Sequence, residues 1–426
     1  MSTREKLLSA FLEAKSVSTD SRSIQAGAIF FALKGDNFNG NIYAQKAIES
    51  GASLAVVDEE QSSLNSHQYI LVEDVLNALQ NLASDYRSLS HAKIIGLTGS
   101  NGKTTCKELF RDVLATRYKT YATKGNLNNH IGVPLTLLSI PLDAEVAIIE
   151  MGANHQGEIA LLTEICRPDI GYITNFGKAH LEGFGGIDGV IKGKSELYNW
   201  LREHHKSALV NGDEELHIEK SEGINRTLFG TGKNCDIQVK NLKSEQASAE
   251  IDGLTIHSQL TGNFHFVNIA ATIALGKLLN VELEKIKVAI ESYNPQMNRS
   301  EWRKTARNEV LMDAYNANPD SMIATIETFA GLNKPNKWFV LGDMFELGKY
   351  AHEEHQNTVE MLVKLKASNV ILVGNEFCKT KPTKDFKVFK STTEAHEYLQ
   401  NIQLSSSTVL LKGSRGMKLE TLIGAL

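Results

Sequence analysis

One short stretch constrains this chain most: an apolar run, a glycine-rich loop and a helical pattern in succession. Residues 94–97 predict a buried strand, and Thr98-Gly99-Ser100-Asn101-Gly102-Lys103-Thr104-Thr105 follows it. The apolar residues of 106–114 then recur at helical spacing. In this order, backbone N–H groups converge on an anion at the positive end of the helix. The stretch predicts a phosphate-binding loop in which Lys103 reaches the terminal phosphates and the Thr104 hydroxyl holds Mg²⁺.

The spacing of this loop departs from the common phosphate-loop pattern. That pattern separates its first glycine from the Gly-Lys pair by four residues, which would put a glycine at position 97, where this chain has leucine. On these residues alone, a glycine turn with a chance lysine stays an alternative. The loop by itself predicts a nucleotide-dependent enzyme and no particular reaction.

The bulk of the sequence excludes several classes of protein. A chain of 426 residues is too long for one core, so two or three domains are expected. A net charge of −5 gives no reason to expect nucleic acid or an anionic membrane as a partner. No apolar run reaches membrane-spanning length, and the four cysteines lie far apart, as in a reducing compartment. We therefore expect a cytoplasmic protein without membrane insertion, whose cysteines are buried thiols.

Strand and helix patterns divide the chain into three predicted units. Residues 1–86 predict a small α/β domain, and residues 87–296 predict a central parallel sheet of the mononucleotide-binding type with a small antiparallel patch. Residues 297–426 again alternate strands and helices, which predicts a Rossmann-like sheet. This third unit lacks Gly-x-Gly-x-x-Gly, so a dinucleotide cofactor is not expected. The fold class is therefore α/β with three domains.

Three polar loops follow strands of the predicted central sheet, at residues 124–134, 150–158 and 175–185. A carboxylate such as Glu150 at the carboxyl end of such a strand lies where ligands bind. Each loop taken singly is also explained as a turn, but together they indicate one shared site. Two further segments stay open on chemistry alone. Residues 19–22 are either a turn or a binding cluster, and residues 263–268 either cap the helix predicted over 269–279 or contact a base or ribose.

These polar segments together resemble the Mur ligases, the ATP-dependent amide-forming enzymes of peptidoglycan precursor synthesis. Beyond the phosphate loop, the resemblance is carried by residues 125–134, 150–158, 179–185, 315–318, 342–344 and 412–415. Within the family, residues 153–158 and 315–318 are similar to the branch whose amine substrate is D-alanyl-D-alanine. The resemblance runs from about residue 18 to the C-terminus.

The resemblance implies a ligation with three substrates. ATP phosphorylates the carboxylate of UDP-N-acetylmuramoyl-tripeptide, and the amine of D-Ala-D-Ala attacks the acyl phosphate. Phosphate then leaves through a tetrahedral intermediate, a path on which cations stabilise developing negative charge. The resemblance also implies two Mg²⁺ ions and a monomeric enzyme. It assigns catalysis to Lys103, Glu150, His180 and Lys194.

The remaining site residues are likewise implied by the resemblance. Mg²⁺ is held by Thr104, Glu150, His180 and Lys194, the last as a carbamate that requires a lowered lysine pKa. Lys192 is the adjacent alternative for that role. ATP is bound by Thr98 to Thr105 together with Asn268, Arg299 and Asp313. The UDP-linked substrate is bound by Thr19, Asp20, Ser21, Arg22, Lys34, Gly35, Asp36, Asn126, Asn128, Asn129 and His155. Closure and amine binding fall to Tyr315, Asn316, Asn318, Lys412 and Arg415.

Two other functions compete with this interpretation. One is another Mur ligase or a folylpolyglutamate synthetase, which residues 19–22 and 153–158 disfavour. The other is a nucleotide-gated switch without ligation, which does not need the set Glu150, His180 and Lys194. In the first unit, Asn39 and Asn41 stand where the family commonly has Asp and His, and His265 stands where it has asparagine.

Overall fold

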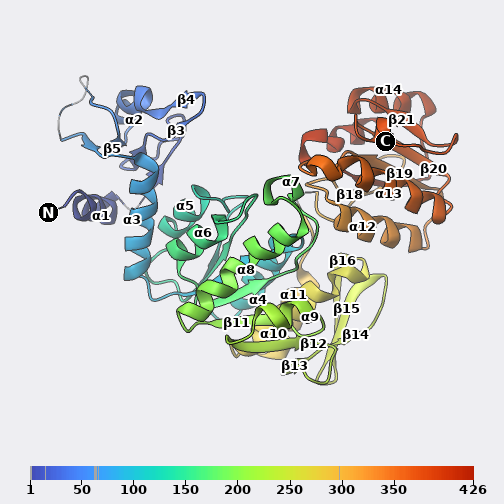
Figure 1. The fold of residues 1–426 in the computed structure, drawn as a ribbon, viewed down its shortest axis with the longest axis horizontal. Coiled ribbons are helices and arrows are strands. Elements are labelled where there is room, and N and C mark those ends of the chain that lie inside the picture. Colours follow the sequence, from blue (N-terminus) through green and yellow to red (C-terminus); the bar gives the residue numbers. More distant parts are fainter. Residues whose placement is uncertain (1, 15, 62–64, 66, 297) are drawn as a thin grey trace.

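Three sheet-centred bodies make up the computed structural model, which describes residues 2–14, 16–61, 65, 67–296 and 298–426. In Figure 1 the N-terminal body and the C-terminal body rise from opposite ends of the central body. The predicted α/β class with an antiparallel patch is confirmed. The exact domain boundaries stay a prediction: position 86 falls inside a helix, and Met297 lies outside the described residues.

The N-terminal body is a small parallel sheet with strand order β1-β2-β5-β6. Its strands are β1 (Val17–Ser18), β2 (Ile29–Phe31), β5 (Leu54–Val57) and β6 (Tyr69–Leu71), and a hairpin of β3 (Lys34–Gly35) and β4 (Phe38–Asn39) stands beside them. Its helices are α1 (Thr3–Ala14), α2 (Ala44–Glu49) and α3 (Val75–Leu89), with a 3-10 turn at Gly40–Tyr43. Helix α3 packs on helices of the central body and so joins the two.

The central sheet has seven strands, all parallel, in the order β13-β12-β11-β10-β7-β9-β8. They are β7 (Lys93–Thr98), β8 (Thr120–Ala122), β9 (Val146–Glu150), β10 (Ile170–Ile173), β11 (Ser207–Asn211), β12 (Asn225–Gly230) and β13 (Ile237–Gln238). The helices are α4 (Lys103–Ala115), α5 (Gly132–Leu138), α6 (Glu158–Cys166), α7 (Leu181–Phe184), α8 (Ile187–Glu203), α9 (Glu215–Lys220), α10 (Phe266–Leu278) and α11 (Leu283–Ser292).

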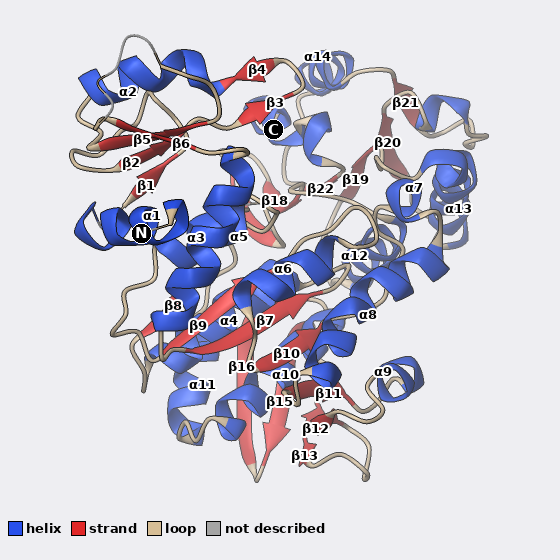
Figure 2. Cartoon of the chain, turned by 60° about the vertical axis from the view of Figure 1, so that its left-hand side comes forward, coloured by secondary structure: helices blue, strands red, loops and turns tan. Residues whose placement is uncertain are grey.

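Alternating side chains on the central strands supply two separate cores. Along β7, Ile95 and Leu97 join the apolar cluster of α4, α10 and α11, whereas Ile94 joins the cluster of α3, α6 and α8. Successive residues of a strand point to opposite faces, so a strand buried on both faces is apolar throughout. The strands and their flanking helices are seen together in Figure 2. This burial fixes β7 and therefore the position of the loop at its carboxyl end.

The predicted antiparallel patch is present beside the central sheet. It consists of β14 (Lys240–Asn241), β15 (Gln246–Ile251) and β16 (Leu254–Thr261), in that order. A 3-10 turn at Asn263–His265 leads directly into α10, so this helix begins at Phe266 and not at 269 as predicted. Asn268 therefore lies inside the first helical turn. The cap residue His265 makes no side-chain capping hydrogen bond, which removes the capping explanation for this segment.

The C-terminal body has one sheet of order β17-β18-β22-β19-β20-β21. Its strands are β17 (Glu301–Lys304), β18 (Glu309–Asp313), β19 (Lys337–Gly342), β20 (Asn369–Val373), β21 (Lys387–Phe389) and β22 (Thr408–Lys412). Its helices are α12 (Pro319–Gly331), α13 (Ala351–Lys364) and α14 (Thr392–Ile402), with 3-10 turns at Gly348–Tyr350, Phe377–Lys379, Arg415–Met417 and Leu419–Ala425. Only the edge strand β17 is antiparallel, because a short turn joins it to β18.

Within the described residues, no helix is both long and apolar enough to cross a membrane. All four cysteines are free thiols. Cys106, Cys166 and Cys235 are buried as predicted, but Cys378 is exposed, which corrects that prediction for one residue.

Candidate active site

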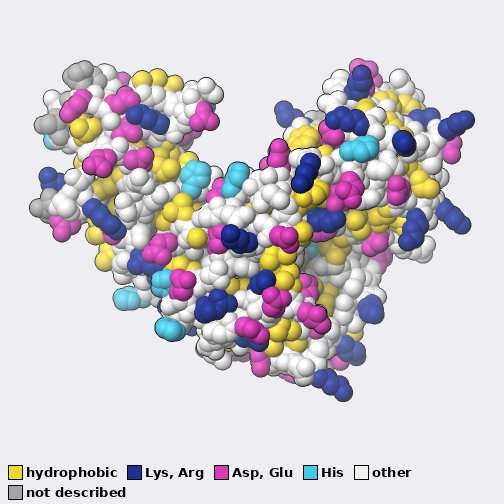
Figure 3. Space-filling view, viewed as in Figure 1, with side chains coloured by type: hydrophobic (Ala, Val, Ile, Leu, Met, Phe, Trp, Pro, Cys, Tyr) yellow, Lys and Arg dark blue, Asp and Glu magenta, His cyan; other side chains and the backbone are white. Residues whose placement is uncertain are grey.

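A cavity of about 920 Å³ lies between the central body and the C-terminal body. The predicted residues that line it are Ser100, Asn101, Gly102, Lys103, Thr104, Thr105, Asn126, Asn128, Asn129, Glu150, His180, Asn268, Arg299, Asp313, Tyr315, Asn316, Asn318 and Lys412. Segments more than 300 residues apart in the chain thus meet in one place, because the loops at the carboxyl ends of two sheets face each other. Figure 3 shows acidic and basic side chains interspersed around the notch between the N-terminal body and the C-terminal body.

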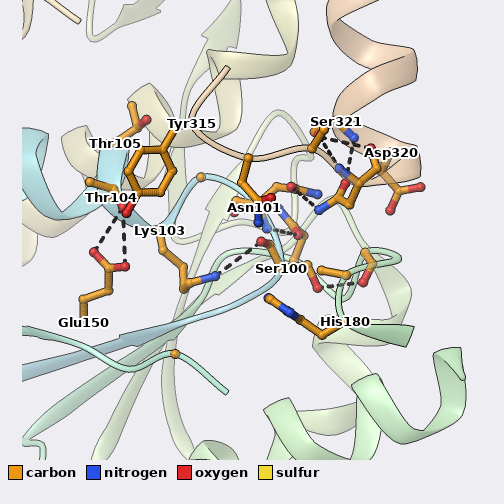
Figure 4. A pocket seen from close by; sticks show the side chains of 18 of the residues that line it. Ser100, Asn101, Lys103, Thr104, Thr105, Glu150, His180, Tyr315, Asp320 and Ser321 are labelled. Atoms are coloured by element: carbon orange, nitrogen blue, oxygen red, sulfur yellow. Dashed lines mark hydrogen bonds between the residues drawn. The ribbon is translucent and has the colours of Figure 1, made fainter. Parts of the chain in front are cut away.

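The phosphate loop turns sharply between β7 and α4, and glycines allow the turn. Gly99 has φ +139° and Gly102 has φ +82°, a region that favours glycine. A Cβ on Gly99 would lie 1.9 Å from Oγ1 of Thr174. Nζ of Lys103 donates to the carbonyls of Gly99 at 2.6 Å and Ser100 at 3.3 Å, so its ammonium lies over the loop, as Figure 4 shows. Desolvation lowers the pKa of Lys103, and the nearby Glu150 carboxylate opposes that shift.

Glu150, the last residue of β9, faces the first turn of α4. Oγ1 of Thr104 lies 3.4 and 3.3 Å from the two carboxylate oxygens (Figure 4), and Nδ2 of Asn128 donates to Oε1 at 2.9 Å. A hydroxyl and a carboxylate oxygen are ligands that Mg²⁺ prefers. Among the described residues, no group of three or more His, Cys, Asp or Glu side chains is placed to hold a metal ion. Thr104 and Glu150 therefore fit Mg²⁺ only if further oxygens come from a modified side chain, substrate or water.

Lys194, on α8, is buried beneath the cavity and does not line it. Its side chain is fully buried, its Nζ lies 3.5 Å from the carbonyl of Ala153, and the Phe184 ring lies 5.1 Å away. Burial holds the pKa of Lys194 well below its usual value, and the charge of Lys103 lowers it further. A neutral amine is what carbamylation requires, so the environment suits that modification. The alternative, Lys192, is exposed.

His180 is turned toward the C-terminal body. Its Nδ1 contacts Oε2 of Glu346, and this hydrogen bond lowers the pKa of Glu346. Close by, the backbone N–H of Glu182 donates to the carbonyl of Glu346 at 3.1 Å. His180 has φ +55°, so the loop ahead of α7 bends to reach this partner. In this arrangement His180 joins two bodies, while its role as a metal ligand stays a prediction.

The C-terminal wall of the cavity contains an ion pair between a buried lysine and a half-buried aspartate. Nζ of Lys412 donates to Oδ2 of Asp313 at 2.6 Å, and Oγ1 of Thr325 donates to the same oxygen at 2.9 Å. Burial alone would raise the pKa of Asp313, but the Lys412 charge and these hydrogen bonds outweigh it and lower the pKa. The guanidinium of Arg299 stacks on the Tyr315 ring at 3.7 Å. Two cations thus face the phosphate loop across the cavity.

A chain of buried polar groups lies behind the glycine loop. Sγ of Cys106 is 3.3 Å from Oδ1 of Asn268, and Nδ2 of Asn268 is 3.2 Å from Nδ1 of His265. Nε2 of His265 lies 3.2 Å from Oγ of Ser300, at the start of the C-terminal body. Burial lowers the pKa of His265 to about 4, so the ring is neutral at pH 7. Asn268 is therefore held by neighbours and presents only part of its amide to the cavity.

Some predicted residues lie elsewhere. None of Thr19, Asp20, Ser21, Arg22, Lys34, Gly35 and Asp36 lines the cavity, since all belong to the N-terminal body. There Arg22 pairs with Asp20, and Lys34 pairs with Asp58 and Glu59. Thr98, Gly99 and His155 also stay outside the lining, with His155 exposed beside Glu158. Arg415 points to Glu420 at 3.0 Å and does not line the cavity either.

The structure adds residues that sequence reasoning missed. The ammonium of Lys107 lies near the Glu150 carboxylate, on the side away from the cavity. Its spacing of four from Lys103 on one helix was the available signal in the sequence. Asp320 accepts a hydrogen bond from the backbone N–H of Lys178 at 2.7 Å, and Glu354 pairs with Nζ of Lys178 at 2.6 Å. These contacts join the central loop to α12 and α13. No local sequence pattern predicts these contacts, because Lys178 belongs to the central body whereas Asp320 and Glu354 belong to the C-terminal body.

Comparisons of the sequence with family models and with curated proteins indicate the same family. Family models match residues 13–87 (Mur ligase family, catalytic domain), 97–276 (Mur ligase middle domain) and 298–415 (Mur ligase, glutamate ligase domain). The UDP-N-acetylmuramoyl-tripeptide–D-alanyl-D-alanine ligase of Bacillus subtilis is 34% identical, over 96% of this chain and 92% of the relative.

Solved structures agree. A crystal structure of MurF from Acinetobacter baumannii has a TM-score of 0.88 at 30% identity, covering 99% of this chain and 97% of that one. The MurF ligase of Thermotoga maritima in complex with ADP has a TM-score of 0.85 at 26% identity, covering 98% and 97%. With three matched ranges and relatives that align over nearly its whole length, the chain belongs to the Mur ligase family.

Proposed function

We propose that this chain is the ATP-dependent ligase that joins D-alanyl-D-alanine to UDP-N-acetylmuramoyl-tripeptide. The observation that carries the proposal is the pairing of Lys103 and the Thr104–Glu150 contact on one wall of a cavity with the Asp313–Lys412 pair on the other. Relatives with this activity in their names align over nearly the whole chain. The products are UDP-N-acetylmuramoyl-pentapeptide, ADP and phosphate.

The phosphate loop supports the first half of this reaction. The N-terminus of α4 and the ammonium of Lys103 offer positive charge where ATP phosphates would lie. Negative charge that develops during transfer of the γ-phosphoryl group to the tripeptide carboxylate is stabilised there. Mg²⁺ would be held by Thr104 and Glu150 and would supply further charge to the transferring oxygens. A second ion would require His180 and a carbamate on Lys194, and this part of the proposal rests on the burial of Lys194.

The opposite wall supports the second half. The amine of D-Ala-D-Ala attacks the acyl phosphate, and the oxyanion of the tetrahedral intermediate needs cations nearby. Arg299 and Lys412 line the cavity from the C-terminal body, and Tyr315 and Asn316 lie beside them. The tripeptide reaches the cavity from the N-terminal body, whose Thr19–Arg22 and Lys34–Asp36 segments we assign to the uridine nucleotide. Asn126, Asn128 and Asn129 line the cavity on the side of the central body.

We also propose a cytoplasmic, monomeric enzyme. A ligase that consumes ATP has to work in a compartment that contains ATP, and the free thiols suit a reducing compartment. Sedimentation velocity tests the monomer.

One assay tests the function as a whole. Phosphate release from ATP is measured with UDP-MurNAc-tripeptide, with and without D-Ala-D-Ala. We expect release to depend on D-Ala-D-Ala and the pentapeptide to form in equal amount. Release that ignores D-Ala-D-Ala would overturn the proposal, and turnover with a free amino acid and a shorter UDP-peptide would favour another member of the family.

A further inference from the structure

Lys107 is a buried lysine that the reaction as described does not use. It lies one turn after Lys103 on α4, and only 3% of its side chain is exposed. A buried ammonium is costly unless opposite charge and hydrogen bonds compensate it. Its partners are the carbonyl of Gly125, 3.4 Å from Nζ, and Oε2 of Glu150, 3.5 Å away. Lys107 therefore lies where the loop after β8 meets the end of β9.

The Glu150 carboxylate is equally buried, with 2% of its side chain exposed. Asn128 donates to one of its oxygens, and the Lys107 ammonium lies near the other. Among the described residues, Lys107 is the one cation within 4 Å of this carboxylate. Glu150 lines the cavity and Lys107 does not. The ammonium thus approaches Glu150 from the protein side and leaves the cavity side of the carboxylate open.

We propose that Lys107 is a positioning residue that bridges the Glu150 carboxylate and the Gly125 carbonyl and weakens the affinity of that carboxylate for a divalent cation. The inference rests on the proposed role of Glu150 as a Mg²⁺ ligand. A divalent ion on the open side of Glu150 lies close enough to the ammonium for charge repulsion to weaken its binding about tenfold or more. The ion is then held firmly only when nucleotide phosphates add their negative charge, so it enters with ATP.

Divalent-cation affinity separates this role from simple packing. Mn²⁺ is titrated into nucleotide-free protein, and the free ion is read by electron paramagnetic resonance. Lys107→Met removes the charge and keeps a side chain of similar length. Lys107→Gln removes the charge as well but retains an N–H donor for the Gly125 carbonyl. We expect both to bind Mn²⁺ about tenfold more tightly than the wild type, and Lys107→Arg, which keeps the charge, to stay near it. A merely structural lysine would give weaker binding when replaced.

Control measurements distinguish three outcomes: a variant that does not fold, a wrong role for Lys107 and a wrong metal assignment for Glu150. Thermal melting checks the fold of every variant, and Lys107→Gln carries the comparison if Lys107→Met does not fold. Unchanged or weaker Mn²⁺ binding in the folded neutral variants overturns the role of Lys107. Glu150→Gln must lower Mn²⁺ affinity; if it does not, the ion is not on Glu150 and the metal assignment itself fails. The dependence of turnover on D-Ala-D-Ala is measured separately and stands or falls without this result.

Discussion

Nδ2 of Asn318 donates a hydrogen bond to Oδ1 of Asn101 at 2.7 Å, which ties the first residue ahead of α12 to the phosphate loop. The other end of the same amide caps the helix, because Oδ1 of Asn318 accepts from the backbone N–H of Ser321 at 2.9 Å. One side chain therefore serves both the order of α12 and the contact between two bodies. We expect closure of the C-terminal body over the nucleotide loop to depend on this hydrogen bond.

Replacing Asn318 separates these two functions. Asn318→Asp keeps the capping oxygen but loses the donor to Asn101, so we expect a normal melting temperature and a KM for ATP about fivefold higher, as for one lost hydrogen bond. Asn318→Ala loses both, so its free energy of unfolding should also fall by about 1 kcal/mol. Steady-state kinetics and denaturant unfolding check these values. An unchanged KM for ATP in both variants would show that the contact does not assist closure.

Lys103→Ala tests the phosphate loop. We expect kcat to fall about 100-fold or more, because one preorganised cation is removed from the transferring phosphoryl group. The fold should survive, since Lys103 donates, within the part of the chain that the structure describes, only to carbonyls of its own loop. Single-turnover phosphate release and circular dichroism measure the two effects. Activity near that of the wild type would mean that the phosphates bind elsewhere.

Lys194→Ala tests the carbamate. We expect severe loss of turnover that short carboxylic acids partly restore, because an acetate or formate ion replaces the missing carboxylate oxygens. Lys192→Ala is the matched control, since Lys192 lies two residues away on the same helix and is exposed. It should retain full activity with no response to added acid. Wild-type turnover of Lys194→Ala without added acid would rule the carbamate out.

His217 gives a prediction on pH and stability. Its ring is fully buried against Phe176, and burial lowers its pKa from 6.5 to about 4. Between these values the unfolded chain binds a proton that the folded protein does not, so stability rises with pH and is lost on acidification. From pH 7 to pH 5 the contribution is about 2 kcal/mol.

The variant His217→Gln removes this titration. Its free energy of unfolding should fall by about 2 kcal/mol less than that of the wild type between pH 7 and pH 5, as measured by urea unfolding at each pH. His205→Gln, at an exposed histidine, is the matched control for replacing one imidazole. Parallel pH profiles for wild type and His217→Gln would contradict the shifted pKa.

Much of the site was accessible to sequence reasoning because its parts are local. A strand, a glycine turn and a helix that follow one another predict the phosphate loop, and polar residues at strand ends predict the opposite wall. Lys107 was missed because a lysine on an amphipathic helix is usually solvated, and its spacing of four from Lys103 indicates a shared helix face but not that it is buried. The start of α10 was misplaced because a 3-10 turn merges with the helix.

Sequence alone predicts the succession of strands and helices, the chemistry of each loop and the family to which the chain belongs. These follow from hydrophobic period and from residue types at fixed spacing, which are properties of short segments. Only the folded chain brings Asn101 to Asn318, His180 to Glu346 and Lys107 to Glu150. Such pairs depend on how separate sheets pack and on which charges become buried. Neither the packing nor the burial can be predicted from one short segment of the sequence.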